Sequence, residues 1–279
     1  MKRTIDFQLP ADSCMFTPFQ LQPRTLLSLT MSAWTRWLRE HFVPLPLLMS
    51  RHLTSVVVGG IEIDYLEPLG FLESDLLDVR AGVRTRREGS TMEVTVDFQS
   101  EAKTVARTKL VLIFVRLEDT RSLAARPARL DPALLARFEA DELTDERAPR
   151  KATALVREFE TYHPACERRT PFTIHRHLCE VADQWSFIEL PNLVALGREA
   201  IGLSPPGGLP SLRGGISRRI LGVHAELHRA FFVFDSGVLV TKAYSTGSRL
   251  AFVHELRSAT DDGPKHATVI EQLDASPFT

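Results

Sequence analysis

The order of predicted elements occurs twice in this sequence. Residues 4–118 contain a strand-like segment, a helix that begins at a proline and four further strand-like segments, and residues 153–274 repeat that order with little shared identity. The two helix starts correspond most clearly, since FQLQPRTLL at residues 19–27 stands where FIELPNLVA stands at residues 187–195. The repeat is too long for a solenoid, so it indicates a duplicated domain. Such duplications place one sheet beside its twin, and we expect the functional site at the seam between the two halves.

Both predicted helices have well-marked ends. The first begins at Pro23, which suits the first helical position because its missing N–H would have no acceptor inside the helix. It is apolar on almost every face as far as Trp34, which is typical of a buried helix. Prolines forbid its continuation past Pro44, and the second helix, residues 191–204, is likewise followed by Pro205.

The segments after each helix are rich in β-branched residues and are bounded by glycine, serine, aspartate or charged residues, which is typical of strands. Residues 92–99 alternate between apolar and polar side chains, so one face of that strand is expected to be buried. Short turns at residues 88–90 and 100–103 predict an antiparallel meander. Between the halves, residues 119–150 are rich in alanine, arginine, proline and acidic residues and predict a surface linker.

Composition limits the class of protein. The chain of 279 residues is 44% hydrophobic and 25% charged, which is ordinary for a globular protein of one or two domains. Its formal charge of -1 provides no global field to attract nucleic acid. Three cysteines without a paired spacing predict neither a disulfide framework nor a zinc site. No apolar run approaches the ~18–20 residues of a membrane helix. We therefore expect a cytoplasmic protein with reduced thiols, no metal and no membrane or nucleic-acid partner.

A curved antiparallel sheet wrapped around one helix, with a strand before the helix, resembles the hotdog fold. The duplicated chain is similar to a double hotdog of the α+β class, in which two curved antiparallel sheets each wrap around a central helix. The resemblance implies an N-terminal hotdog at residues 1–120, a linker at 121–152 and a C-terminal hotdog at 153–279. A homodimer stays open, because the duplication already supplies the pairing that single hotdogs obtain by dimerising.

The segment that leads into the second helix resembles hotdog thioesterases of the hydroxybenzoyl-CoA type. Those enzymes carry an aspartate after the first strand, an asparagine nine residues on and Glu-Ala seven residues further, and Asp183, Asn192 and Glu199 reproduce this spacing. The resemblance implies that Asp183 is the nucleophile or general base at a thioester carbonyl. Asn192 and the helix N-terminus would position the carbonyl, with Glu199 as a second carboxylate.

The chain also departs from the thioesterase pattern. Related acyl carrier protein thioesterases place asparagine and histidine in the loop after that aspartate, whereas this chain has Trp185 and Phe187. Apolar side chains cannot polarise a carbonyl or position a water, although Trp185 could contact a substrate. The alternative roles are a loop or helix cap for Asp183 and Asn192, and a solvated or ion-paired carboxylate for Glu199. A non-catalytic acyl-binding or pathway-assembly protein is therefore a second hypothesis.

Four histidines are further candidates. His175 and His177 lie two apart on a predicted strand and hence on one sheet face. Hotdog dehydratases use a histidine with an acidic partner to move a proton α to a thioester, which gives a dehydratase alternative. His224 and His228 are also expected to share a strand face, without the close approach of a metal-binding pair. The alternative for both pairs is that they are surface or half-buried histidines without a catalytic or metal-binding role.

A second resemblance is to the leinamycin-type acyltransferase/decarboxylase, a double hotdog of polyketide pathways. Residues 27–37, LSLTMSAWTRW, carry it. That family works through a tyrosine on the following strand, whereas residues 53–61 contain none and the nearest is Tyr65. The architecture therefore carries over and the acyl-tyrosine chemistry does not. Tyr65 is a candidate substrate contact or a half-buried strand aromatic.

Two groups of arginines flank predicted strand ends: Arg84, Arg86 and Arg87, and Arg213, Arg218 and Arg219. Charge-assisted hydrogen bonds from such groups would bind the 3'-phosphate of CoA or an acidic helix of an acyl carrier protein, and a solvated face is the alternative. We therefore predict a thioesterase or acyltransferase of a biosynthetic, polyketide-like pathway, with acyl-CoA or acyl carrier protein as partner. It needs no resident cofactor, because CoA or phosphopantetheine belongs to the substrate.

Overall fold

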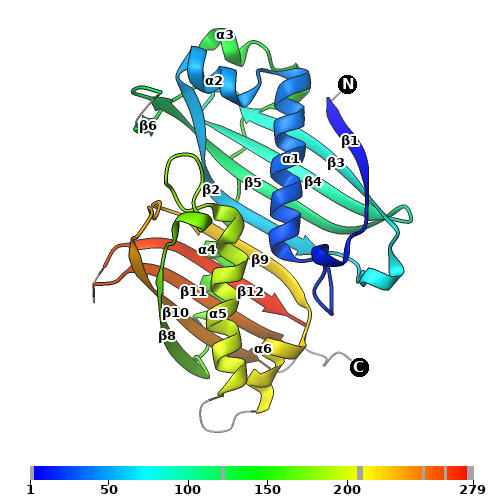
Figure 1. Ribbon diagram of the computed structural model, residues 1–279, viewed down its shortest axis with the longest axis vertical. Helices are drawn as coiled ribbons and strands as arrows, with labels where there is room; N and C mark the ends of the chain where they lie inside the picture. Colours follow the sequence, from blue (N-terminus) through cyan, green and yellow to red (C-terminus); the bar gives the residue numbers. More distant parts are fainter. Residues whose placement is uncertain (1–2, 121–122, 206–209, 247–248, 261–262, 275–279) are drawn as a thin grey trace.

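The computed structural model describes residues 3–120, 123–205, 210–246, 249–260 and 263–274 (Figure 1). The first half contains β1 (Thr4–Pro10), α1 (Pro23–His41), α2 (Leu45–His52), β2 (Thr54–Tyr65), β3 (Leu76–Arg86), β4 (Thr91–Ser100) and β5 (Lys103–Leu117). The connecting segment contains β6 (Ala125–Pro127), α3 (Pro132–Leu135), β7 (Leu143–Thr144) and α4 (Lys151–Phe159). The second half contains β8 (Cys166–Thr173), α5 (Leu190–Leu203), α6 (Gly214–Ser217), β9 (Ile220–Leu227), β10 (Ser236–Thr246), β11 (Arg249–Ser258) and β12 (Lys265–Leu273).

The strands form one continuous 12-stranded sheet whose main path runs β1-β3-β4-β5-β2-β9-β12-β11-β10-β8. The mixed helix and antiparallel-sheet class is confirmed, but the two predicted sheets are joined. β2 and β9 pair antiparallel at the centre, with Ile61 opposite Ala225. The physical reason is that each half ends in an edge strand with unpaired backbone groups, and the two edges satisfy each other.

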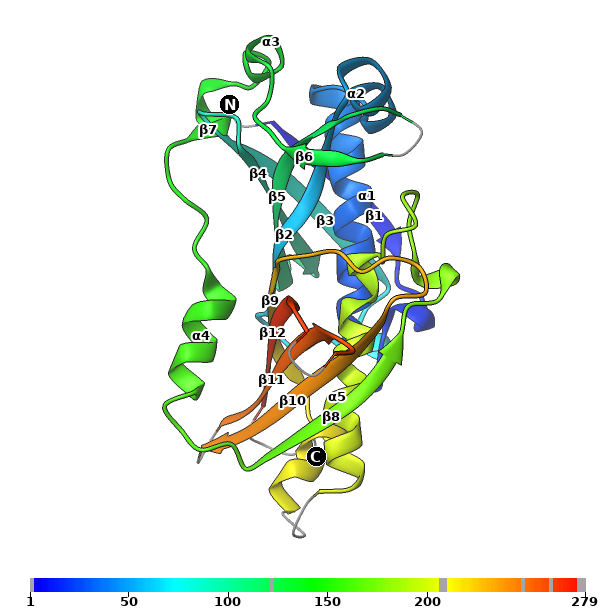
Figure 2. The same ribbon diagram turned by 90° about the vertical axis from the view of Figure 1, so that its left-hand side faces the viewer.

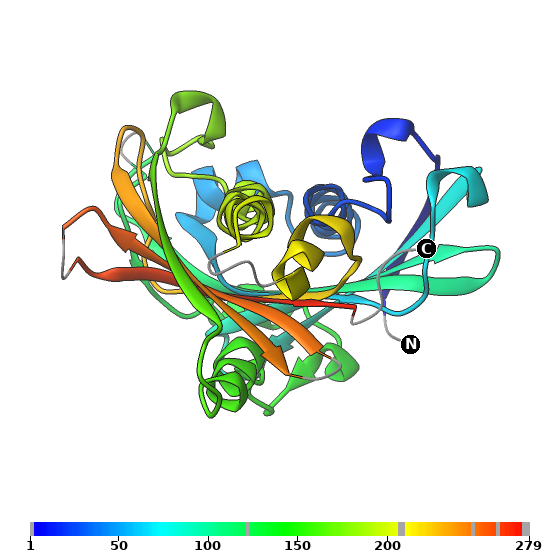
Figure 3. The same ribbon diagram turned by 90° about the horizontal axis from the view of Figure 1, so that it is seen from below.

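Two long helices lie side by side on one face of this sheet. α1 covers the first half and α5 the second, and the two helices contact each other (Figure 3). The short helix α4 lies on the opposite face of the sheet (Figure 2), whereas β6 and β7 of the connecting segment pair with β5 and β3. The seam between the halves is therefore bounded by the sheet below and by a helix from each half.

The predicted first helix is confirmed, with Pro23 in its first turn and eight buried residues. Trp34 and Trp37 are almost completely buried. The indole N–H of Trp34 donates to the sulfur of Met92 at 3.2 Å. β4 also alternates between buried and half-buried residues, as the pattern of residues 92–99 predicted. The spacing of apolar residues thus placed both layers of the first half correctly.

α5 approaches the sheet more closely than a side chain on its inner face would allow. A Cβ atom at Gly197 would lie 2.1 Å from Oγ1 of Thr241 on β10, so only glycine fits there. Pro191 lies in the first turn of this helix, as predicted. Among the described residues, every helix is too short or too polar to span a bilayer.

Candidate active site

A cavity of about 380 Å³ lies between the two halves, on the helix side of the sheet. Both halves contribute to its apolar walls: Met31 and Trp34 of α1, Val56 and Val58 of β2, and Trp185 and Phe187 from the loop before α5. The predicted location of a site at the seam therefore coincides with a cavity. Its size and its mainly apolar lining are typical of sites that hold small ligands.

A tight turn of the second half brings polar side chains to this cavity. The N–H of Glu180 donates to the carbonyl of Gln184 at 2.8 Å, and the N–H of Asp183 donates to the carbonyl of Glu180 at 3.0 Å. Asp183 has a φ of 52°, in the left-handed region. The turn is held in place by the N–H of Trp185, which donates to the carbonyl of Phe231 at 2.9 Å. As a result the side chains of Glu180 and Gln184 line the cavity, and that of Asp183 does not.

The environment of the cavity disfavours charge. Glu180 is an exposed residue of the cavity wall, and desolvation by the protein around its carboxyl raises its pKa. Burial also lowers the pKa of His228 and of His266, which are further members of the wall. All three shifts favour the neutral forms.

His266 is fixed by its neighbours. Its Nδ1 lies 3.1 Å from the carbonyl oxygen of Ala230, to which it donates. Its Nε2 then accepts from the hydroxyl of Ser258 at 2.9 Å. The ring of Phe231 stacks on the imidazole with centroids 3.7 Å apart. His266 is therefore a rigid, neutral part of the wall, whereas His228 is exposed and has no side-chain partner among the described residues.

The three residues predicted from the thioesterase spacing have other partners. Asp183 forms an ion pair with Arg176 at 2.6 Å, and more than half of each side chain is exposed. The amide of Asn192 donates to Glu189 at 3.0 Å. Glu199, seven residues and a rise of about 10 Å further along α5, lies 3.4 Å from the guanidinium of Arg198. None of these three side chains lines the cavity, so the structure does not bring them together around it.

The two apolar residues of the same loop do face the cavity. Trp185 and Phe187 are buried members of its wall, at the two positions where the resemblance to acyl carrier protein thioesterases implied asparagine and histidine. The predicted contact of Trp185 with a substrate stays a prediction. A short 3₁₀ helix, Phe187–Glu189, continues from this loop into α5, so the start of α5 lies next to the cavity.

The predicted placement of His175 and His177 on a strand is wrong. β8 ends at Thr173 because its partner β10 begins opposite it, at Ser236. The two histidines lie at a following 3₁₀ turn, where their exposed rings stack with centroids 6.0 Å apart. Neither belongs to the cavity wall.

The shared strand face predicted for His224 and His228 is also wrong, because β9 ends at Leu227. His224 is buried on the α4 side of the sheet, with its Nε2 3.0 Å from the carboxylate of Asp64. His228 follows the strand and lines the cavity on the other side. No three His, Cys, Asp or Glu side chains of the described residues are arranged to hold a metal ion.

Tyr65 and the arginines are engaged elsewhere. The hydroxyl of Tyr65 donates to the carbonyl of Leu21 at 2.6 Å, and burial raises the pKa of this phenol. Arg218 donates to the carbonyl of Asp274 at 3.2 Å, and Arg219 lies 4.0 Å from the carboxylate of Asp274. Arg213 is exposed near α6, at the opposite end of α5 from its start (Figure 1). None of these residues lines the cavity.

The arginines of the first half have local partners as well. Arg86 pairs with Glu88 at 3.1 Å, and Arg87 pairs with Asp145 at 3.2 Å. A role for either arginine group in binding a carrier stays a prediction.

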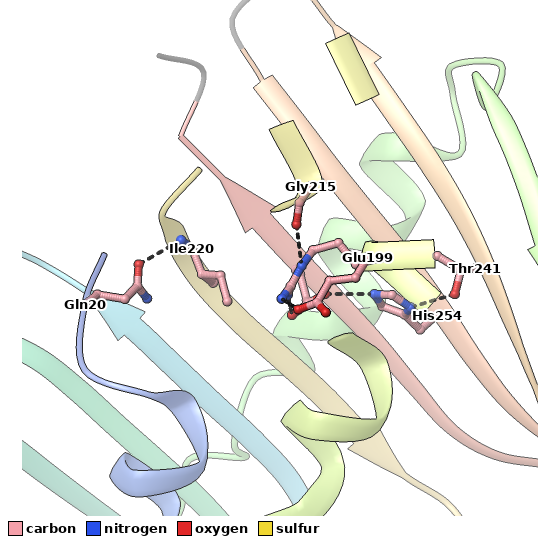
Figure 4. A network of polar contacts seen from close by, with 8 residues as sticks. Gln20, Glu199, Gly215, Ile220, Thr241 and His254 are labelled. Atoms are coloured by element: carbon pink, nitrogen blue, oxygen red, sulfur yellow. Dashed lines mark hydrogen bonds and ion pairs between the residues drawn. The ribbon is translucent and has the colours of Figure 1, made fainter. Parts of the chain in front are cut away.

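A buried polar network that no sequence pattern indicated lies between α5 and the sheet (Figure 4). The hydroxyl of Thr241 lies 2.9 Å from Nδ1 of His254, and Nε2 of His254 lies 3.1 Å from the carboxylate of Glu271. The same carboxylate accepts a hydrogen bond from Arg198, whose Nε donates to the carbonyl of Gly215 at 3.0 Å.

This network resembles a hydroxyl–imidazole–carboxylate relay, but Thr241 is fully buried beneath α5, so no substrate can reach it. Burial alone would raise the pKa of Glu271, but Arg198 and His254 lower it. The members are scattered over one helix and three strands, and no local sequence pattern connects them. We therefore interpret the network as structural.

The fold is shared with known thioesterases. No protein-family model and no curated protein matches the sequence. A proposed oleoyl thioesterase from Lactobacillus plantarum has a TM-score of 0.76 at 11% identity, over 99% of this chain and 98% of that one. A 12:0-ACP thioesterase from Umbellularia californica has a TM-score of 0.68 at 10% identity, over 99% and 94% of the two chains.

An acyl-ACP thioesterase from Bacteroides thetaiotaomicron has a TM-score of 0.66 at 11% identity, over 97% of this chain and 98% of that one. These likenesses span nearly the whole of each chain, so the protein has the fold of these thioesterases, and the predicted hotdog fold is confirmed. The resemblance to the leinamycin-type protein stays a prediction.

Proposed function

We propose that this protein hydrolyses acyl thioesters and holds the acyl chain in the cavity between its two halves. The observation that supports this proposal best is the cavity itself. Its walls are mainly apolar, as an acyl chain requires, and its polar groups are few: Glu180, Gln184, His228, Arg229 and His266 are the main ones. A carboxylate, an amide and imidazoles are the groups that position and activate a water for attack on a carbonyl.

The proposed substrate is supported by the proteins that share the fold. Two of those named above are acyl-ACP thioesterases, so an acyl group on an acyl carrier protein, or on CoA, is the proposed substrate. CoA or phosphopantetheine would enter as part of that substrate. A biosynthetic, polyketide-like pathway is supported only by the sequence resemblance. We also propose that each half, residues 1–120 and 153–279, is one hotdog unit, with residues 121–152 as the linker.

Hydrolysis requires stabilisation of the oxyanion that forms when water attacks the carbonyl. The 3₁₀ turn Phe187–Glu189 lies beside the cavity at the start of α5. The N–H groups of Glu189 and Leu190 donate to the carbonyls of Ser186 and Phe187, whereas those of Phe187 and Ile188, at the beginning of the turn, have no acceptor inside it. These N–H groups are the proposed donors to the thioester oxygen. The dipole of α5 adds positive potential at the same end.

A second candidate function is a non-catalytic acyl-binding protein. Trp185 and Phe187 favour it, because they fill the positions of two polar residues of acyl carrier protein thioesterases with apolar surface. Such a protein would bind the acyl chain in the same cavity and leave the thioester intact. The two functions differ only in turnover, so one assay separates them.

The assay incubates the purified protein with a panel of acyl-CoA and acyl carrier protein substrates of graded chain length. Free thiol is measured with a thiol-reactive dye, and mass spectrometry identifies free acid, CO₂ or loss of water. Hydrolysis predicts thiol and free acid in equal amounts. Binding without any product would favour the second candidate, and CO₂ or a dehydrated acyl group would indicate the decarboxylating or dehydratase alternative.

A further inference from the structure

The thioesterase spacing assigns the general base to Asp183, but this residue does not reach the cavity. Asp183 forms an exposed ion pair with Arg176. Trp185 and Phe187, which follow it in the same loop, are apolar and cannot accept a proton. An exposed carboxylate held by a guanidinium is a poor base, because the ion pair stabilises its charged form. If the protein hydrolyses thioesters, another residue must accept the proton of the attacking water.

The same turn supplies another carboxylate. The left-handed conformation of Asp183 reverses the chain between Glu180 and Gln184, so these two side chains line the cavity that Asp183 does not reach. The bridges of Cys179 with Trp185 and of Gln184 with Phe232 hold the turn against the second half. Glu180 is thus held at the wall by the backbone of its own turn.

The other charged or titratable groups of the cavity wall are His228, Arg229 and His266. The side chain of Glu180 forms no ion pair or hydrogen bond among the described residues. Glu180 is exposed at the cavity wall, so water can reach it, and desolvation by the surrounding protein raises the pKa of its carboxyl. A carboxylate in this state is a stronger base than one in water, because its pKa lies closer to neutral pH.

We infer that Glu180 is the general base of this site and takes a proton from the water that attacks the thioester carbonyl. This inference rests on the proposed function. The water oxygen bonds to the carbonyl carbon as Glu180 receives the proton. When the tetrahedral intermediate collapses, the carbon–sulfur bond breaks and the thiolate receives the proton from Glu180. The products are a carboxylic acid and a thiol, and the carboxylate of Glu180 is restored.

The test compares three variants of the full chain on a substrate that the wild type hydrolyses. Glu180→Gln keeps the shape of the side chain and removes the base. Asp183→Asn makes the same change at the position given by the thioesterase spacing. Glu160→Gln, on the exposed end of α4 at the opposite face of the sheet, is the matched control. Thermal unfolding and binding of a non-hydrolysable acyl thioether establish that each variant keeps its fold and its cavity.

We expect kcat of Glu180→Gln to fall by about 10²–10⁴-fold, the usual contribution of general base catalysis, with the affinity for the thioether unchanged. Glu180→Asp should recover part of this loss. The rate of the wild type should fall as the pH drops through the pKa of Glu180, and this inflection should be missing in Glu180→Gln.

Two results would overturn the inference in distinguishable ways. If the wild type is active, and Glu180→Gln keeps its rate within a few-fold while Asp183→Asn loses it, Asp183 is the base and the proposed function stands. If the wild type binds the thioether but hydrolyses none of the substrates, both the inference and the proposed hydrolase function are wrong.

Discussion

The carboxylate of Asp64 lies 3.0 Å from Nε2 of His224 and joins the two halves of the molecule by their side chains. The two residues belong to β2 and β9, the strands that pair at the seam. Lys151, at the start of α4, donates to both oxygens of the same carboxylate at 2.8 Å. One acidic group therefore connects both halves of the sheet and the segment between them.

The first prediction concerns this carboxylate. Asp64→Asn should lower the free energy of unfolding by about 1–3 kcal/mol, because it leaves the buried His224 with a weaker partner and Lys151 without a counter-charge. Chemical denaturation at neutral pH measures the change. Asp6→Asn is the control, since Asp6 and Arg80 form an ion pair in which both side chains are more than half exposed. It should cost less than about 1 kcal/mol.

The same pair gives a prediction for pH dependence. Burial alone would raise the pKa of Asp64, but the hydrogen bonds of His224 and Lys151 lower it to about 2. Its value in the unfolded chain is about 3.9. The charged form therefore stabilises the folded protein above about pH 4, and this stabilisation is lost as the pH falls toward 2. The difference in unfolding free energy between wild type and Asp64→Asn should shrink over that range. A constant difference would contradict it.

A third prediction tests the close approach of α5 to the sheet. Gly197→Ala would place a methyl group 2.1 Å from Oγ1 of Thr241, so helix and strand must move apart. Overpacking of this kind costs about 1–3 kcal/mol, measured by urea denaturation. Gly70→Ala is the control, because its methyl group would be 3.5 Å from the nearest side-chain atom, Oε2 of Glu73. Equal stability of both variants would show that α5 can shift without cost.

Sequence patterns predicted those parts of the molecule that depend on local spacing. The apolar surface around Trp34 and the start at Pro23 define a buried helix wherever the chain places it. The alternation of residues 92–99 requires one buried face. The duplication predicted a seam, and the cavity lies there. It did not predict a joined sheet, since edge pairing depends on how the two halves meet.

The residues that line the cavity could be predicted from the sequence less well than the fold, because their positions depend on the backbone conformation of single residues. Asp183 has a positive φ, which the surrounding sequence does not specify, and its side chain lies outside the cavity wall. Glu180 was not a candidate, because the motif begins three residues later. His175 lies outside β8 because the partner strand β10 begins at Ser236, opposite Thr173. Spacing drew attention to a loop that lines the cavity, and the turn within it decides which side chains reach the cavity.

A fourth prediction concerns the buried network under α5. Glu271→Gln removes the buried charge that Arg198 and His254 contact and leaves Arg198 with only the half-exposed carboxylate of Glu199, at 3.4 Å, as a counter-charge. Breaking a buried pair in this way costs about 3–5 kcal/mol, which would appear as a lower midpoint of urea unfolding. The matched change Glu158→Gln breaks an ion pair with Arg249 in which both side chains are at least half exposed, and it should cost less than about 1 kcal/mol. Similar losses in the two variants would contradict the structural role.

The last prediction concerns which acyl chains the cavity accepts. Trp185 forms part of its wall and is 6% exposed, so Trp185→Leu should enlarge the cavity without exposing a polar group. Val56→Phe, on β2 of the other half, should reduce the same space. We expect the first variant to shift binding toward longer or bulkier acyl thioethers and the second toward shorter ones. A change of one methylene in an apolar pocket is worth about 1–3 kcal/mol. The affinities of two thioethers that differ by one methylene should therefore differ by about 10-fold or more, and the chain length that binds best should change in each variant. Calorimetric titration with a chain-length series measures this order. If both variants keep the wild-type order, the acyl chain binds elsewhere, and the proposed function loses the observation that supports it best.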